Sequence, residues 1–189
     1  MDAACGARHS DAVFDQTVVV GPNNELANVV VSISSGLGED VYPAPSEPAV
    51  LDQNGCMYEP HVLPVMVGQK IMIKNSDPFM HNVHGFPQTR SQFNFAQPNV
   101  DPGKEIEPFR LPETALVKCD VHPWMRSYMV AIPHPFFSKT KNDGAYAIQN
   151  LPAGEYTVKA WHEKFGEIEQ QVTVEDGKKV ELNLSFKTK

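Results

Sequence analysis

One ten-residue segment restricts the fold more than any other part of the sequence. It runs from Val117 to Arg126 and reads VKCDVHPWMR. A thiol, an imidazole and a thioether follow one another at intervals of three residues, in Cys119, His122 and Met125. We expect a tight loop here, held rigidly between two flanking strands. Such a loop offers three soft or borderline ligands to a single metal ion.

A second segment, DPFMHNVH from Asp77 to His84, supplies what the loop lacks. A histidine from this distant strand completes a set of two histidines and one cysteine with a weak axial methionine, which mononuclear electron-transfer copper prefers. Zinc also accepts cysteine and histidine. Structural zinc sites, however, usually contain a CxxC pair, and no cysteine here has a second within four residues. The sequence therefore favours copper over zinc.

These two segments resemble the cupredoxins, or blue copper proteins, and among them the amicyanin and plastocyanin-like members. The resemblance lies in the Cys-x-x-His-Pro-aromatic-Met-Arg run from Cys119 to Arg126 and in the run from His81 to Phe86. It covers roughly residues 51–132. It implies a Greek-key β-sandwich, and thus an all-β fold for this part of the chain.

The resemblance also implies a ligand set for one copper ion that cycles between Cu(I) and Cu(II). His81, Cys119 and His122 are its equatorial ligands, and Met125 is the axial one. In the family, the residue at the position of Asn82 forms a hydrogen bond to the strand next to the cysteine. We expect Asn82 to link the two ligand segments in the same way.

Each of these residues also has a purely structural interpretation. Cys119 is then a buried thiol, and the two histidines are satisfied core or surface residues. Met125 is core packing, with Met129 as the axial ligand or with none. His84 lies three residues after His81 and on a strand points to the opposite face, as a surface residue or a neighbour of the ligands.

Cys56 and His61 have no counterpart in amicyanin. They are part of a second metal site, or lie near the copper, or are a buried thiol and a surface imidazole.

The composition indicates many short strands, because 16 prolines and 12 glycines are spread along 189 residues. The formal net charge of −7 makes nucleic acid an unlikely partner and favours a positively charged protein. The resemblance implies redox partners of the cytochrome or dehydrogenase type. Pro123 and Trp124 place an apolar patch around His122, suited to a brief docking contact with a partner, or Trp124 packs beneath the neighbouring domain instead.

Three parts follow along the chain. Residues 1–12 are small and polar and predict a flexible tail. Residues 13–132 predict the cupredoxin domain, extended at its start by a hairpin of Thr17–Val20 and Ala27–Ile33. Residues 133–189 predict a smaller β-sandwich. Through residues 140–148 and 151–156 it resembles the transthyretin-like regulatory domain of carboxypeptidases, which implies an accessory role.

The cysteines bear on the compartment. Ala3-Ala4-Cys5-Gly6 resembles the end of a bacterial lipoprotein signal, so Cys5 either carries a lipid anchor or is a free thiol in the tail. We expect a periplasmic or otherwise extracytoplasmic protein. No apolar run approaches the roughly 18 residues of a membrane-spanning helix.

The preferred hypothesis is a single-electron carrier, and since no pairing of nucleophile and base is visible we do not expect an enzyme. One rival is a copper enzyme, or an atypical copper centre, with an open position that involves Cys56, His61 or His84. A second is a copper carrier or chaperone. A third is a metal-free binding module in which the loop is a relic of the fold.

Overall fold

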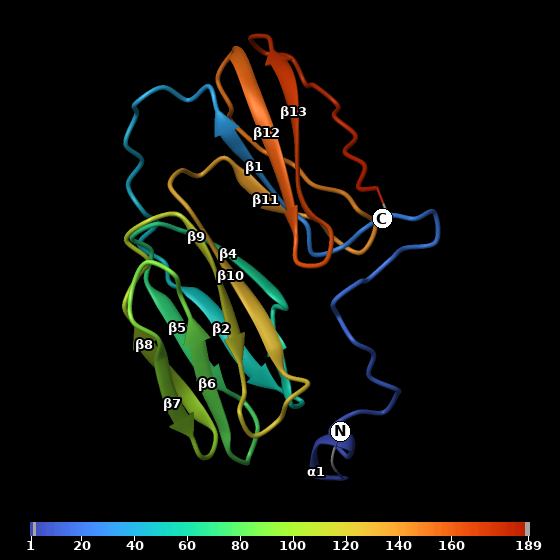
Figure 1. The fold of residues 1–189 in the computed structure, drawn as a ribbon, viewed down its shortest axis with the longest axis vertical. Helices are drawn as coiled ribbons and strands as arrows, with labels where there is room; N and C mark the ends of the chain where they lie inside the picture. Colours follow the sequence, from blue (N-terminus) through green and yellow to red (C-terminus); the bar gives the residue numbers. More distant parts are fainter. Residues whose placement is uncertain (2, 188–189) are drawn as a thin grey trace. The chain divides into compact units, whose positions relative to one another are not determined.

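The computed structural model describes residues 1 and 3–187, and their regular secondary structure is almost entirely β-strand (Figure 1). The chain divides into two compact units. Unit 1 contains residues 1–16 and 43–133, and unit 2 contains residues 17–42 and the chain from His134 onward. The backbone therefore passes between the units three times. Within the described residues, no helix is long and apolar enough to cross a membrane.

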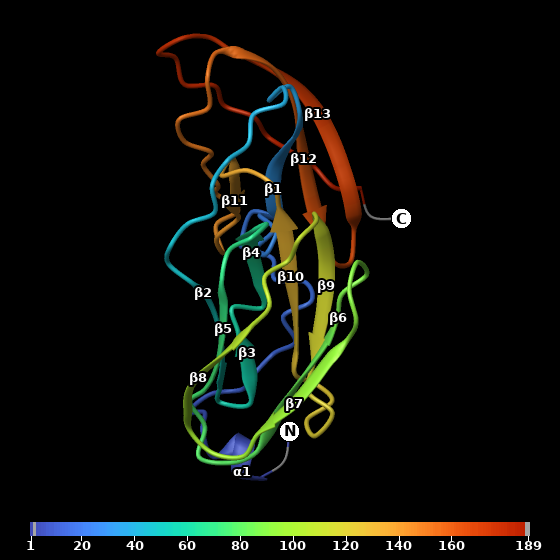
Figure 2. The ribbon, with the colours of Figure 1, turned by 90° about the vertical axis from the view of Figure 1, so that its left-hand side faces the viewer.

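Unit 1 is a sandwich of two sheets. The first has five strands in the order β4 (Val62–Met66), β10 (Arg126–Ile132), β9 (Glu113–Lys118), β6 (His81–Phe86) and β7 (Phe93–Gln97). The second has four, in the order β3 (Met57–Glu59), β2 (Ala49–Asn54), β5 (Ile71–Asn75) and β8 (Asp101–Ile106). The pairs β4 with β10 and β2 with β5 are parallel. Figure 2 shows the two sheets as facing layers.

The core of unit 1 lies between these layers. Ile71 and Ile73 of β5 are fully buried, whereas Met72 and Lys74, which alternate with them, are half-buried. This alternation confirms the expectation that one face of the strand packs on the core. The core cluster contains aliphatic residues from both sheets together with Cys119 and Met125. The ligand loop is therefore anchored in the packed interior.

Unit 2 is built on one four-stranded sheet. Its order is β11 (Phe137–Lys139), β1 (Val30–Ser35), β12 (Gly154–His162) and β13 (Gly166–Val174). The extended residues 145–151 and 182–186 contribute Tyr146, Ile148 and Leu184 to the packing on this sheet. The Tyr146 hydroxyl donates to the Leu182 carbonyl oxygen at 2.8 Å, which ties the two segments together. This second layer makes the unit a small β-sandwich, as predicted.

The predicted hairpin near the start of the chain is wrong. Val20 and Leu26 form one isolated bridge, and β1 pairs instead with β11 and β12. Residues 17–42 therefore belong to unit 2, not to the cupredoxin domain proposed for residues 13–132. The β-branched run Val29–Ile33 identifies a strand, but it carries no information about partners more than 100 residues away in sequence.

The flexible tail predicted for residues 1–12 is also wrong. Residues Ala3–Gly6 form the one-turn helix α1, and Cys5 is fully buried in a disulfide with Cys56. The Cys5 thiol is therefore not free, as one of the two interpretations had it, but is linked covalently across 51 residues. A sulfur in a disulfide has no remaining bond for a lipid, so this link and a lipid anchor on Cys5 exclude each other.

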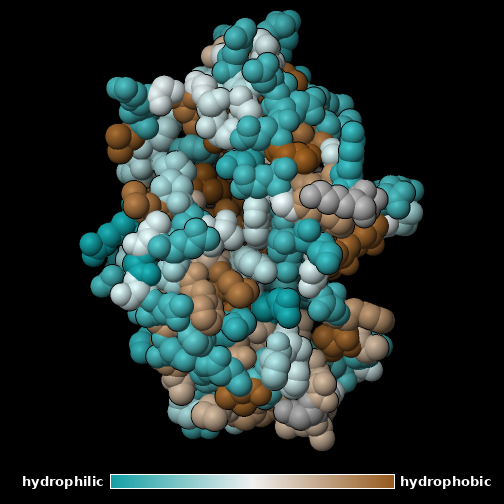
Figure 3. Space-filling view, viewed as in Figure 1, coloured by the Kyte–Doolittle hydropathy of each residue, from teal (hydrophilic) through white to brown (hydrophobic). Residues whose placement is uncertain are grey.

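The surface carries no large apolar patch on the face drawn in Figure 3, where hydrophobic residues form small groups within hydrophilic surroundings. Single exposed hydrophobic residues of this kind are normal for a folded protein. Inside unit 1, a cluster of buried residues that includes Cys119 and Met125 surrounds the ligand loop.

Candidate metal centre

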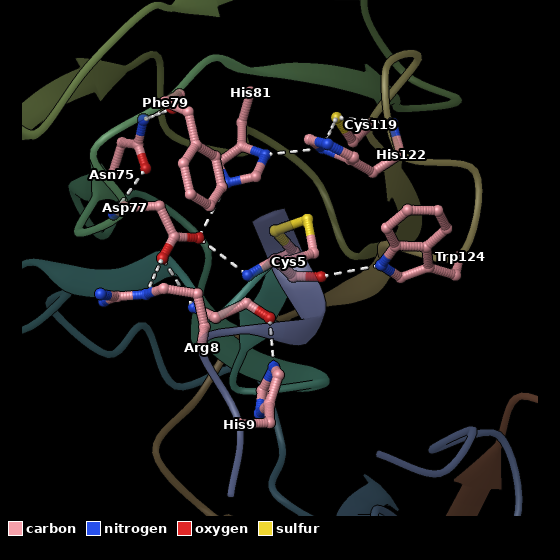
Figure 4. Close-up of a disulfide and its surroundings, with 12 residues drawn as sticks. Cys5, Arg8, His9, Asn75, Asp77, Phe79, His81, Cys119, His122 and Trp124 are labelled. Carbon is pink, nitrogen blue, oxygen red and sulfur yellow. Dashed lines mark hydrogen bonds and ion pairs between the residues drawn. A yellow bond between two sulfur atoms is a disulfide. The ribbon is translucent and has the colours of Figure 1, made fainter. Parts of the chain in front are cut away.

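The three predicted equatorial ligands converge (Figure 4). His81, Cys119 and His122 form one group whose ligand atoms all lie within 4.8 Å of one another. His81 Nδ1 lies 2.9 Å from His122 Nδ1, and the latter lies 3.8 Å from Cys119 Sγ. All three side chains are buried. Two segments far apart in sequence thus meet at one point, as the sequence predicted.

Strand register explains this convergence. His84 of β6 lies opposite Lys118 of β9, and the two strands are antiparallel. His81, three residues before His84, therefore extends beyond the end of β9 to the level of the ligand loop. Residues after Lys118 leave the ladder there and supply Cys119 and His122.

The ligand loop closes on itself through backbone hydrogen bonds. The Cys119 N–H donates to the Met125 carbonyl oxygen at 3.2 Å, and the Met125 N–H donates to the His122 carbonyl oxygen at 2.9 Å. Met125 is fully buried within this closed loop. Met129 is equally buried, but it lies further along β10, opposite Ala115. Met125 is thus the thioether whose position is fixed together with Cys119 and His122.

Asp77 orients the first histidine. The Nε2–H of His81 donates to Asp77 Oδ2 at 2.8 Å, and both side chains are fully buried. With the proton held on Nε2, the Nδ1 lone pair points towards His122 and Cys119, as second-sphere carboxylates commonly arrange for metal-binding histidines. Burial alone would raise the pKa of Asp77, but hydrogen bonds from the Cys56 N–H and His81 outweigh it and lower the pKa. The carboxylate is therefore held in its charged form.

The donor atoms fit a metal ion of the copper type. Two imidazole nitrogens 2.9 Å apart repel each other unless a proton or a cation lies between them. Burial raises the pKa of the Cys119 thiol, yet hydrogen bonds from His81 and from backbone N–H groups outweigh it and lower the pKa. The lowered pKa favours the thiolate, which is the metal-binding form. Two imidazoles and a thiolate, with the buried Met125 on the same loop as the thiolate, match the preference of mononuclear copper.

Asn82 links the two ligand segments as expected. Its Oδ1 accepts from the Asp120 N–H at 2.6 Å and lies 3.3 Å from Cys119 Sγ, which donates to it. The Tyr58 hydroxyl adds a second link, because it donates to the Asn82 carbonyl oxygen at 2.6 Å and lies 3.2 Å from that of Lys118. The strand that carries His81 and the strand that leads to Cys119 are thus held at fixed separation.

A hairpin turn between β2 and β3 supports Asp77 from the other side. Gly55 and Cys56 are its two central residues, with φ of 61° and 55°. Such a two-residue turn requires positive φ at both positions. Their N–H groups donate to the Asp77 carboxylate at 2.9 and 2.8 Å. At Gly55 a side chain is also excluded by space, since a Cβ would lie 2.7 Å from the His9 ring.

The N-terminal segment completes this arrangement. Arg8 Nε lies 3.4 Å from Asp77 Oδ1, and His9 Nε2 donates to the Gly55 carbonyl oxygen at 2.6 Å. The Trp124 indole N–H donates to the Cys56 carbonyl oxygen at 3.1 Å, which connects the ligand loop to the same turn. Sequence reasoning missed Asp77, Arg8 and this turn. The available signals were the Gly55-Cys56 turn dipeptide and the two cysteines left over once Cys119 is a ligand.

The remaining sequence candidates have different positions. Cys56 is a disulfide sulfur close to the predicted ligands, grouped with Cys5 and His122 and separately with Asp77 and His81. His61 is buried with its ring edge-to-face on Tyr128, and it belongs to none of the potential metal groups found among the described residues. His84 lies on the opposite side of β6, with Nδ1 3.1 Å from the Asp120 carboxylate.

Comparison with known proteins finds similar proteins for two parts of the chain. A family model described as a carboxypeptidase regulatory-like domain matches residues 134–187. Similar solved structures include a variant of amicyanin in the Cu(I) state, at 24% identity over 54% of this chain and 98% of that one, with a TM-score of 0.39. A purple cupredoxin from Nitrosopumilus maritimus is similar at 20% identity over 44% of this chain and 99% of that one, with a TM-score of 0.35.

A copper-containing nitrite reductase from Thermus scotoductus SA-01 is similar at 18% identity and a TM-score of 0.38. The match covers 52% of this chain and only 25% of the reductase, so about half of this chain corresponds to a quarter of that protein. A search of curated proteins finds no relative of the sequence. The two resemblances seen in the sequence, to cupredoxins and to the carboxypeptidase regulatory domain, are thus both found again.

Proposed function

We propose that unit 1 binds one copper ion through His81, Cys119 and His122, with Met125 as the axial ligand, and carries single electrons. The observation that supports this most is the meeting of two Nδ1 atoms and one thiol, from two separate segments, within 4.8 Å of one another. Copper in such a set exchanges one electron between its two oxidation states.

The surrounding residues suit electron transfer because they resist movement. Asp77 fixes the ring of His81, and Asn82 fixes the backbone after Cys119. Ligands held in this way change position little when the charge on the ion changes, which keeps the energetic cost of each transfer small. Two histidines and a cysteine with an axial methionine are the ligand set that electron-transfer copper prefers, so we propose a carrier and not an enzyme.

Two further features support a place of action and a kind of partner. A buried disulfide between Cys5 and Cys56 is typical of oxidising compartments, and we propose an extracytoplasmic protein on that basis. The net charge of −7 favours a redox partner with a positive face, which it would attract over a distance.

The test is copper loading of the whole chain, followed by visible absorption and paramagnetic resonance. We expect one copper per chain and an intense thiolate-to-copper band, and we expect the variant Cys119→Ser to lack the band. A reversible one-electron wave in protein-film voltammetry would support the carrier role. The proposal fails if the copper-loaded wild type lacks the band, or if the band survives in Cys119→Ser.

A matched pair of variants tests the axial ligand. Met125→Leu and Met129→Leu both replace a fully buried thioether by a side chain of similar volume. We expect the first to shift the absorption band and the reduction potential and the second to leave both unchanged. The opposite pattern would assign the axial position to Met129.

A further inference from the structure

The disulfide lies beside the proposed copper ligands. Cys5, Cys56 and His122 form a group whose ligand atoms lie within 4.8 Å of one another, and all three are buried. Cys56 forms a second such group with Asp77 and His81. Figure 4 draws the disulfide among these residues, with the imidazoles on one side and the Asp77 carboxylate on another. Two sulfur atoms are thus within coordinating range of a histidine that already has another role.

A disulfide that served only to stabilise the fold would not need to lie beside the proposed copper ligands. Any disulfide between the N-terminal segment and the β2–β3 turn would close the same loop and restrict the unfolded chain equally. A disulfide sulfur carries no negative charge and binds metals poorly, whereas a thiolate binds soft ions strongly. The group of Cys5, Cys56 and His122 therefore becomes a ligand set once the disulfide is opened.

We propose that reduction of the Cys5–Cys56 disulfide creates a second, copper(I)-specific site formed by Cys5, Cys56 and His122. A protein or small-molecule dithiol supplies the two electrons by thiol–disulfide exchange, and its own sulfur atoms form a disulfide. The S–S bond of the chain breaks and two thiols form. When Cu(I) binds, the two thiols release their protons and become ligands. Two thiolates and one imidazole suit Cu(I) because soft sulfur donors select it.

The two sites are alternatives because both use His122. Copper held by Cys5 and Cys56 withdraws this imidazole from Cys119, so the redox state of the disulfide decides which site is occupied. Oxidised, the chain presents the electron-transfer set. Reduced, it presents a thiolate-rich set that retains Cu(I).

The N-terminal segment gives a reductant a way in. Cys5 itself is buried, but its neighbours Ala3, Ala4 and Gly6 are exposed, and α1 is a single turn. The contacts that hold the segment include the ion pair of half-exposed Arg8 with Asp77 and the hydrogen bond of His9 to Gly55. Terminal segments generally open locally at a lower free-energy cost than the strands of a core.

The test uses the variant Cys119→Ser, in which the proposed electron-transfer site lacks its thiolate, so that its outcome does not depend on the proposed function. The variant is reduced with dithiothreitol, freed of reductant under argon, and equilibrated with Cu(I) and the chelator bathocuproine disulfonate. We expect the reduced form to retain one Cu(I) per chain and the oxidised form to retain none.

Two controls separate the thiols from the loss of the link. The reduced Cys119→Ser variant, alkylated with iodoacetamide, has the same open disulfide but no free thiols, and it should retain no copper. A chain with Cys5→Ser, Cys56→Ser and Cys119→Ser also has neither the disulfide nor the thiols, and it should likewise retain no copper. Circular dichroism confirms that each form is folded. Equal copper retention by the reduced and alkylated forms would overturn the proposal.

A matched pair of histidine variants identifies the third ligand. In the Cys119→Ser background, His122→Ala should abolish retention of Cu(I) by the reduced chain, whereas His81→Ala should preserve it. X-ray absorption at the copper edge should show two sulfur neighbours and one nitrogen. Retention lost with His81→Ala and kept with His122→Ala would assign the copper to Cys56, Asp77 and His81 and refute the proposed site.

Discussion

Buried histidines occur in both units, but their ring nitrogens are used differently. In unit 2, His134 donates from Nε2 to the Ile33 carbonyl oxygen at 2.8 Å and accepts at Nδ1 from the Phe136 N–H at 3.2 Å. Both nitrogens are satisfied by neutral backbone. In unit 1, His81 donates to a carboxylate with Nε2, while Nδ1 faces another imidazole. Burial alone does not mark a metal ligand, whereas a second nitrogen aimed at another donor atom does.

The largest test of this contrast is to remove each imidazole. His81→Ala takes away a proposed ligand, so we expect copper affinity to fall by more than the roughly 10- to 100-fold typical of losing a second-sphere partner. His134→Ala should leave copper affinity unchanged and instead lower the free energy of unfolding of unit 2 by about 1–3 kcal/mol, because the backbone groups of Ile33 and Phe136 lose their partner. Competition titration and urea unfolding measure the two effects.

The comparison would fail if His134→Ala weakened copper binding as much as His81→Ala. The chain has two tryptophans, Trp124 in unit 1 and Trp161 in unit 2, so fluorescence reports on both units during unfolding.

The carboxylate behind His81 allows a sharper test. Asp77→Asn keeps the shape and an acceptor oxygen but removes the charge that polarises the ring. We expect copper affinity to fall by about 10- to 100-fold and the absorption band to shift, with the copper stoichiometry unchanged. Isothermal titration and absorption of the loaded variant provide the measurement. Asp52→Asn, at a carboxylate that bonds to Ser76 and not to a ligand, is the matched control. Equal affinities for wild type and Asp77→Asn would show that the carboxylate serves only the turn.

A smaller effect is expected at Tyr58, which holds the two ligand segments without contacting the metal set. Tyr58→Phe removes one buried hydroxyl that bonds to the Asn82 carbonyl oxygen. We expect a loss of about 1 kcal/mol in the free energy of unfolding of unit 1 and little change in copper affinity. Urea unfolding of the metal-free chain gives the first value. A large fall in affinity with unchanged stability would mean that the hydroxyl has a role at the metal.

The smallest effect concerns pH and unit 2. Burial lowers the pKa of His134 from its ordinary 6.5, and only part of this is offset by the hydrogen bond to Ile33. The unfolded chain therefore binds a proton near pH 6.5 while the folded unit does not. The contribution of neutral His134 to the free energy of unfolding is fully present above pH 6.5. It declines as the pH falls from 6.5 towards the lowered pKa of the folded state. His134→Gln should reduce this decline, as unfolding followed at pH 7.5 and pH 5.5 would show. An identical decline in both proteins would exclude His134 as its source.

The ligand loop and the core strands were predictable because their signals are local. Cys119, His122 and Met125 occur within seven residues, and the alternation around Ile71 and Ile73 directly marks a buried face. Their partner His81 was recognisable from its own local motif. A pattern contained in a few neighbouring residues is preserved whatever the rest of the chain does.

The second sphere of the site could not be predicted, because its members are remote from one another in sequence. Asp77 precedes a proline and was interpreted as the end of a strand, and Cys5 lies in a segment that resembles a disordered tail or a processed signal. Their roles depend on where the β2–β3 turn brings Cys56, which is a property of the assembled sandwich. The partners of β1 were missed for the same reason, since residues 137–139 and 157–161 are remote in sequence.

Each unit is built from two separate segments of the chain, and this order has a consequence for biosynthesis. Every residue of unit 1 has been translated once the ribosome passes Pro133, so unit 1, which holds the proposed copper site, can fold first. β1 is translated early, but it has no strand to pair with until β11 and β12 have been translated. A gene fragment cut after residue 133 would leave that strand permanently unpaired. To produce unit 1 alone, residues 17–42 must therefore be replaced by a linker between residues 16 and 43.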